Sequence, residues 1–123
     1  MNFILVFLGG GIGASARYWM QGAVHRMAGA GFPYGTLAVN VLGSLLIGVL
    51  LSLFEERFVV NSSLRVFLTI GILGGFTTFS SFSYETIALL RDGSFGLSLW
   101  NIGSSIVLCL GATWLGMVLG KLL

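Results

Sequence analysis

The stretch that decides the fold runs from Gly71 to Thr86 and reads GILGGFTTFSSFSYET. It overlaps a charge-free segment, Val66 to Tyr84, that is about as long as a helix spanning a bilayer core. Hydroxyl side chains stand at positions 77, 78, 80, 81 and 83, too many to share one helix face. A membrane helix that is polar around most of its circumference must be buried among other helices or line water.

The paired glycines Gly74 and Gly75 weaken this helix in the middle of its span. We therefore expect a break between Gly74 and Thr78. A broken helix leaves carbonyls unpaired at the end of its first half and amides unpaired at the start of its second. The carbonyls around Gly74 to Thr77 suit a small cation, whereas the amides and hydroxyls that follow favour an anion.

The composition is that of a membrane protein. Of 123 residues, 56% are hydrophobic and 8% are charged, against about a quarter charged in soluble domains, and the mean hydropathy is +1.00. Arg17 is the one charged residue in the first apolar segment and must reach the interface, pair, or line a cavity. The sequence predicts an all-α membrane protein with a single transmembrane domain, residues 1–123, whose four helices span about 3–24, 35–54, 65–89 and 95–120.

Other interpretations of short motifs in the chain are excluded by the residues around them. Residues 14–16 resemble a signal-peptide cleavage site, but no positively charged region precedes the apolar stretch. Residues 9–14 fit a dinucleotide fingerprint, but the segment is a predicted membrane span and the first acid is Glu55. Cys109 is the only cysteine, so we expect it to pack as a small residue. The scattered basic residues predict no nucleic-acid surface.

Basic residues are divided almost evenly between the two ends of the predicted bundle. Excess Lys and Arg normally mark the cytoplasmic side, so an even division allows insertion in both orientations. An antiparallel dimer of inverted copies becomes plausible. Three basic residues lie at one end and two at the other: Arg57, Arg65 and Lys121 against Arg26 and Arg91.

Small residues at helical spacing predict close helix packing. These pairs are Gly9 with Gly13, Gly71 with Gly75, Gly116 with Gly120, and Ser44 with Gly48.

Three groups of side chains are candidates for an ion pathway. Phe79 and Phe82 share a helix face, where they either pack or turn their positive ring edges toward an anion. Asn40 either forms an interhelical hydrogen bond or donates to a passing ion. Asn101 and Ser105 share a face of the last span and form a possible polar track.

With these motifs, the chain resembles the Fluc (CrcB) family of fluoride channels over essentially its whole length. The resemblance rests on Arg17-Tyr18 at the end of a glycine-rich span, on residues 35–43 (GTLAVNVLG) and on residues 74–83 (GGFTTFSSFS). It implies an antiparallel, dual-topology homodimer in the cell (inner) membrane, with two pores that let fluoride leave passively. It implies no enzyme and no catalytic residues.

The resemblance also assigns roles. Phe79 and Phe82 would form a phenylalanine box, Asn40 would face fluoride, and Ser105 would belong to the polar track. Near one pore end would lie Ser81, Tyr84 and Glu85. The backbone carbonyls of Gly74 and Thr77 would bind a structural, untransported Na⁺ at the dimer centre. Some family members carry Tyr where Asn101 stands and Ser where Cys109 stands, and Arg17 is interpreted as a structural or vestibule charge.

Two other functions remain open. A proton-coupled exporter of the small multidrug resistance type also has four spans, but it needs a carboxylate within the membrane, and Glu85 is the lone candidate. A membrane assembly subunit explains the packing glycines but not the hydroxyls and phenylalanines gathered in one broken span.

Fluoride is a strongly hydrated acceptor, so its dehydration requires hydroxyl, amide and ring-edge donors.

Overall fold

The computed structural model describes residues 2–56 and 59–123, and Arg57 lies outside this part. In the described ranges, four helical segments are long and apolar enough to cross a membrane: Asn2–Ala28, Tyr34–Glu55, Ser62–Arg91 and Phe95–Leu122. The elements are α1 (Asn2–Ala28), α2 (Tyr34–Glu56), α3 (Ser62–Arg65), the π-helix η1 (Val66–Leu73), α4 (Gly74–Phe76), α5 (Phe79–Arg91) and α6 (Phe95–Leu122). The predicted all-helical architecture is confirmed.

The first helix is longer than its hydropathy predicts. α1 continues past Val24 to Ala28 and carries Arg26 in its last turn. A positive side chain there favours the helix, because the last carbonyls carry partial negative charge. Gly29 then adopts a φ of +86°, and its N–H donates to the His25 carbonyl at 2.9 Å. The helix therefore ends on a glycine in the left-handed region.

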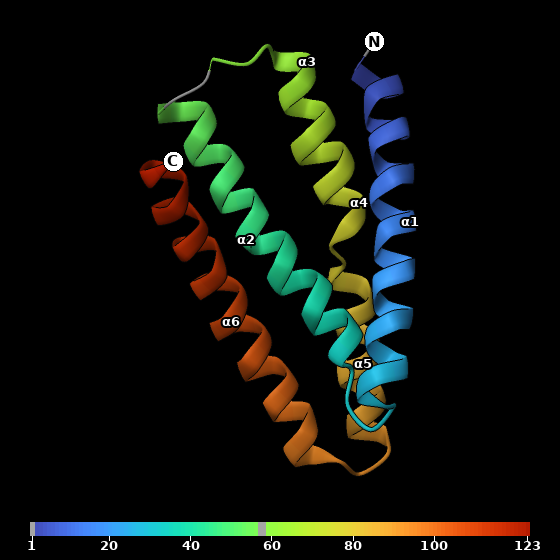
Figure 1. Cartoon of the computed structure of the whole chain (residues 1–123). Helices are drawn as coiled ribbons and strands as arrows, with labels where there is room; N and C mark the ends of the chain where they lie inside the picture. The colour runs from blue at the N-terminus through green and yellow to red at the C-terminus, as the bar shows by residue number, and fades with distance from the viewer. Residues whose placement is uncertain (1, 57–58) are drawn as a thin grey trace.

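The third span is bent. α3, η1 and α4 follow one another without a gap, and α5 begins only after Thr77 and Thr78, both of which have extended backbone angles. Figure 1 shows this interruption about halfway along the span. It falls within the expected interval, but Gly74 and Gly75 are themselves helical. The chain leaves the helix at the threonines that follow.

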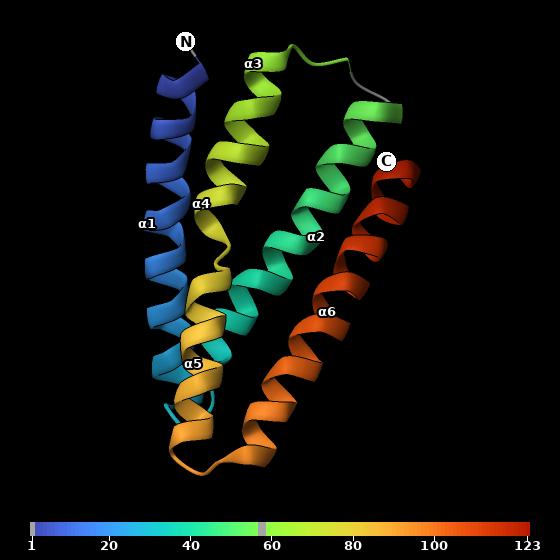
Figure 2. The ribbon, with the colours of Figure 1, turned by 180° about the vertical axis from the view of Figure 1, so that it is seen from behind.

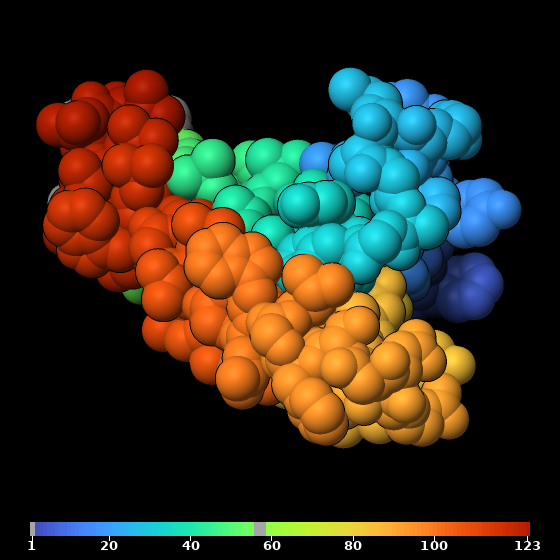
Figure 3. Space-filling model, turned by 90° about the horizontal axis from the view of Figure 1, so that it is seen from below, coloured from blue at the N-terminus to red at the C-terminus, as the bar shows by residue number. Residues whose placement is uncertain are grey.

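The helices associate in two pairs. α2 packs along α6, and α1 packs along η1 and α4. Figures 1 and 2 show the pairs leaning apart toward the end that carries both termini. The α1–α2 and α5–α6 connections lie together at the opposite end (Figure 3).

Glycines bring the paired backbones into contact. A Cβ atom added at Gly9 would lie 2.8 Å from the Phe67 carbonyl oxygen, and one at Gly116 would lie 3.0 Å from the Val49 nitrogen. The first distance is shorter than real Cβ atoms show, and the second is tighter than nine in ten of their contacts. These contacts match the close packing that small residues provide in membranes.

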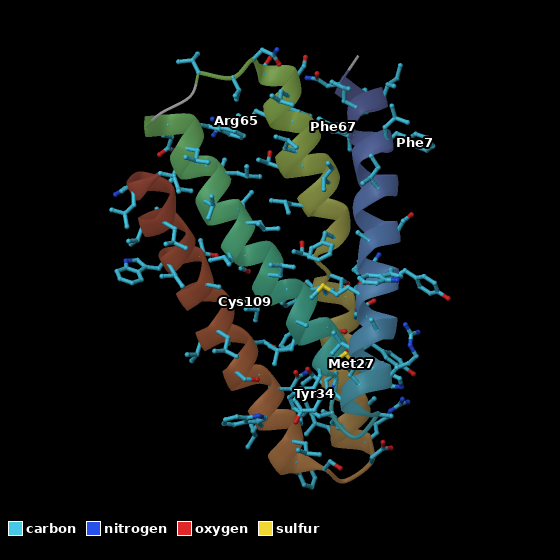
Figure 4. All side chains as sticks on the ribbon, in the orientation of Figure 1. Phe7, Met27, Tyr34, Arg65, Phe67 and Cys109 are labelled. Carbon is cyan, nitrogen blue, oxygen red and sulfur yellow. The ribbon has the colours of Figure 1, made fainter. Side chains whose placement is uncertain are left out.

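Large apolar side chains cover the outside of the molecule. Among the described residues, the buried hydrophobic side chains are Phe32, Val39, Leu73 and Phe76. Phe7 is 78% exposed and points away from the other helices (Figure 4). A soluble protein rarely exposes so much apolar surface. The fold is therefore that of a multi-pass helical membrane protein.

The glycine contacts predict different effects for two substitutions on α1. In Gly13→Ala the new Cβ would lie 2.9 Å from both the Ile72 carbonyl carbon and the Phe76 nitrogen, whereas Gly11 has nothing within 4 Å. We expect Gly13→Ala to lose about 1–3 kcal/mol of stability, the usual cost of overpacking, and Gly11→Ala to lose none. Thermal unfolding in detergent, followed by tryptophan fluorescence, measures both. Equal melting temperatures would contradict the proposed contact.

Candidate functional site

The interruption of the third span is capped by its own side chains. Thr78 precedes α5, and its hydroxyl accepts a hydrogen bond from the Ser81 N–H at 3.2 Å. The Thr77 hydroxyl donates to the Leu73 carbonyl at 3.0 Å, on the other side of the gap. The first bond satisfies an amide that the broken helix exposes, and the second adds to the bond that the Thr77 N–H makes to the same Leu73 carbonyl at 3.1 Å.

Asn40 on α2 binds the interruption directly. Its side-chain N–H donates to the Thr78 carbonyl at 3.0 Å, and its side-chain oxygen accepts from the Thr78 N–H at 2.8 Å. One side-chain amide thus satisfies both the N–H and the carbonyl of Thr78, as the backbone of a neighbouring strand does in a β-sheet. Asn40 therefore forms an interhelical bond. A primary amide has two N–H groups, and the Thr78 carbonyl accepts a hydrogen bond from only one of them.

Arg17 on α1 binds the other side of the interruption. Its Nε–H donates to the Gly75 carbonyl at 3.0 Å. This carbonyl lies near the C-terminal end of the helical segment before the gap, where partial negative charge accumulates. This hydrogen bond is a specific contact that agrees with the structural role suggested for Arg17. The sequence contains no signal for this partner, because Gly75 lies 58 residues away along the chain.

Two carbonyls at the interruption lose their helical donors. In a continuous helix the Thr78 N–H would donate to Gly74, and the Ser81 N–H would donate to Thr77. Here the first donates to Asn40 and the second to the Thr78 hydroxyl. Hard cations prefer oxygen ligands, so the Gly74 and Thr77 carbonyls are a donor set that fits Na⁺. No group of three or more His, Cys, Asp or Glu side chains occurs within residues 2–56 and 59–123.

An open cavity of about 550 Å³ lies beside the interruption. Phe79 and Phe82 line it, with ring centroids 5.3 Å apart and ring planes tilted by 47°. Asn40 from α2 lines the same cavity, as do Ser105 and Cys109 from α6. The structure therefore brings four of the predicted pathway residues into one place, and Cys109 lies with them.

The remaining predicted residues lie elsewhere. Ser81 and Glu85 line a second cavity, of about 500 Å³, together with Thr36 and Arg26. The Oε1 atom of Glu85 is buried and has no hydrogen-bond partner in the described part of the chain. Tyr84 is 68% exposed and lines neither cavity.

The possible polar track on the last span is divided. Ser105 faces the first cavity, but Asn101 is buried and donates to the Thr86 hydroxyl at 3.0 Å. Thr86 and Ser98, which bind one another at this contact, were not singled out by the sequence pattern. Their only sequence signals are the spacing of Thr86 four residues after Phe82 and of Ser98 three residues before Asn101.

These features define a multi-pass helical membrane protein whose third span is interrupted beside a cavity lined by aromatic, amide and hydroxyl groups. The chain belongs to the CrcB family, because the family described as CrcB-like protein, Camphor Resistance (CrcB) matches residues 4–117.

Similar proteins cover almost the whole chain. A protein of Magnetococcus marinus is 48% identical over 123 residues, which are 100% of both chains. One of Geobacter metallireducens is 45% identical over 121 residues, 98% of each chain. One of Geobacter sulfurreducens is 48% identical over 112 residues, 91% of this chain and 90% of the relative. All three bear the name Fluoride-specific ion channel FluC. The predicted family is confirmed, and so is the expectation that the chain is not an enzyme.

Substituting Asn40 tests how the interruption is held. Asn40→Leu leaves the Thr78 N–H and carbonyl without their partners, which is expected to cost about 1–3 kcal/mol for each buried group. We expect a lower melting temperature and faster deuterium exchange in the peptide that contains Thr78, measured by mass spectrometry. Asn61→Ala is the control, because Asn61 caps α3 through a bond to the exposed Leu64 N–H. Asn61→Ala should raise exchange near Leu64 alone. Unchanged exchange at Thr78 in Asn40→Leu would contradict the role given to the Asn40–Thr78 hydrogen bonds.

Proposed function

We propose that this protein is a fluoride channel that lets fluoride leave the cell passively across the cell (inner) membrane and so lowers fluoride toxicity. The relatives named as fluoride-specific ion channels support this proposal, because they cover at least 90% of this chain at 45–48% identity. The residues matched include the third span, where the candidate site lies.

The observation that carries the proposal is the cavity beside the interruption. Its lining offers donors of the kind that dehydrated fluoride needs: the second N–H of Asn40, the Ser105 hydroxyl, and the ring edges of Phe79 and Phe82. None of the described residues that line it carries a charged side chain. Donors without a fixed positive charge hold an anion weakly enough for it to leave, as conduction requires.

The functional unit we propose is an antiparallel, dual-topology homodimer with two pores. The nearly even division of basic residues between the two ends supports insertion in both orientations. A second observation is that Phe79 is 76% exposed in the single chain although it lines the cavity. A second copy against this face would cover the ring and complete a pathway that one chain leaves open.

We also propose a structural Na⁺ at the dimer centre, held by the carbonyls of Gly74 and Thr77. The loss of their helical donors supports the assignment, as described above for the Thr78 and Ser81 amides. The Nε–H of Arg17 binds the neighbouring Gly75 carbonyl. In this arrangement the chain supplies oxygen ligands and the ion would neutralise their partial negative charge.

Fluoride release from liposomes tests the channel. Purified protein is reconstituted into vesicles loaded with potassium fluoride, and a potassium ionophore is added to relieve the membrane voltage. We expect rapid fluoride efflux, measured with a fluoride electrode, and no comparable efflux from vesicles loaded with chloride. Absence of fluoride efflux, or equal passage of chloride, would refute the proposal.

The same assay tests the two phenylalanines. Phe79→Ile or Phe82→Ile removes the polarised ring edge while keeping an apolar side chain, so each is expected to abolish efflux and leave the dimer intact. Phe7→Ile is the matched control, because Phe7 lies on the outer side of α1 away from both cavities. Wild-type efflux in both cavity variants would return these rings to a packing role.

Glu85→Gln separates the channel from a proton-coupled exporter. Glu85 lines a different cavity from Phe79 and Phe82, so loss of its charge is expected to change the rate of fluoride efflux without abolishing it. The efflux should also follow the fluoride gradient when a pH gradient of either sign is imposed at constant voltage. An exporter would lose coupled transport in Glu85→Gln and would move its substrate uphill in the wild type.

A further inference from the structure

A buried polar cluster joins α5 to α6 away from both cavities. It consists of Thr86 on α5 and of Ser98 and Asn101 on α6, which are 6%, 0% and 2% exposed. The Ser98 hydroxyl donates to the Thr86 carbonyl at 3.1 Å, and the Asn101 side-chain N–H donates to the Thr86 hydroxyl at 3.0 Å. Two side chains of α6 thus converge on one residue of α5.

Thr86 also forms a hydrogen bond to Phe82. Its hydroxyl accepts from Asn101 and donates to the Phe82 carbonyl at 2.7 Å. The hydroxyl is therefore a donor and an acceptor at once, and its rotamer is fixed from both sides. Because hydrogen bonds in a chain polarise one another, the series Asn101–Thr86–Phe82 ties α6 to the helical turn of α5 that begins at Phe82.

The cluster lies close to the turn where α5 and α6 meet. Gly93 has a φ of +81°, and the Ser94 N–H donates to the Leu89 carbonyl at 2.9 Å, so α5 ends in a Schellman motif. From this turn the two helices diverge, and α6 continues along α2 (Figure 2). The cluster therefore lies near the connected ends of the two helices.

Both helices of this junction contribute residues to the cavity lining. Phe82 stands four residues before Thr86 on α5, and Ser105 stands four residues after Asn101 on α6, one helical turn in each case. Both line the cavity, while Thr86, Ser98 and Asn101 do not. The cluster consequently links α5 and α6 one helical turn from both of these cavity-lining residues.

We propose that Asn101 is a positioning residue for the fluoride pathway, acting through Thr86 on Phe82. This inference rests on the proposed function for its consequence in transport, but the positioning itself is a property of the single chain. Asn101 is thus not a pore-lining member of the polar track. Its substitution alters selectivity because it moves a ring that discriminates between anions.

The first measurement reads the ring directly. 4-Fluorophenylalanine is placed at position 82, and its ¹⁹F NMR signal is recorded in detergent for the wild type, Asn101→Leu and Thr86→Val. We expect both variants to shift or broaden the signal, and Thr86→Ser, which keeps the hydroxyl, to restore it. Thr113→Val is the matched control, because the Thr113 hydroxyl donates to the Ser44 carbonyl at 3.1 Å between α6 and α2. An unchanged signal in Asn101→Leu would overturn the proposal.

The double variant separates positioning from stability. Thr86→Val leaves the buried Asn101 side-chain N–H without its acceptor, and Asn101→Leu leaves the Thr86 hydroxyl bound to the Phe82 carbonyl alone. Thr86→Val with Asn101→Leu removes both partners and should melt close to the wild type. The ring signal should remain altered in this stable protein. A wild-type signal in the double variant would show that the cluster serves stability alone.

Transport is the second readout. We expect Asn101→Leu and the double variant to lower the ratio of fluoride to chloride efflux by about tenfold, which corresponds to about one buried hydrogen bond, and Thr113→Val to leave it unchanged. An unaltered ratio in both variants would overturn the link to selectivity. If the wild type conducted no fluoride while the ring signal still responded, the proposed function would fail and the positioning would stand.

Discussion

The pairing of the Asn40 side chain with the Thr78 backbone is the interaction on which the third span depends. A helix interrupted in an apolar environment exposes N–H and carbonyl groups that cannot turn to water, and each unpaired group costs several kcal/mol on the scale of about 4–8 kcal/mol for transfer to hydrocarbon. Asn40 satisfies one N–H and one carbonyl with a single side chain. The break is therefore a defined structure with its own partners.

The other partners of the interruption depend on how closely the helices approach. Arg17 reaches the Gly75 carbonyl from α1, and a Cβ atom at Gly75 would lie 2.5 Å from the Gly10 carbonyl oxygen. A larger residue at position 75 would push α1 away and take the guanidinium out of reach. The glycines thus serve the polar contacts as well as the packing. With α1 and α2 both bound to the gap, α5 starts in a fixed direction and presents Phe79 and Phe82 to one cavity.

The sequence allowed the helical fold, the four spans and the interval of the break to be predicted, because these follow from local hydropathy and from residue types that helices tolerate poorly. The position of the break within that interval was not predictable from the glycines. Gly75 packs against the backbone of α1 while both glycines stay helical, and the break falls at Thr77 and Thr78, where Asn40 offers a partner. The contact of Asn101 with Thr86 could not be predicted from the local sequence pattern either. A polar residue on a helix indicates that it needs hydrogen-bond partners but not which residues supply them.

The distribution of side chains around α5 explains why the chain can hold a carboxylate close to a proposed anion pathway. Phe79 and Phe82 line the first cavity, whereas Ser81 and Glu85, spaced by one helical turn, line the second. A carboxylate facing the ring edges would repel an anion and attract a cation. Separation across the helix keeps the Glu85 charge away from the donors of the first cavity. Thr86 takes a third direction, toward α6, so one helix of 13 residues serves two cavities and one interhelical junction.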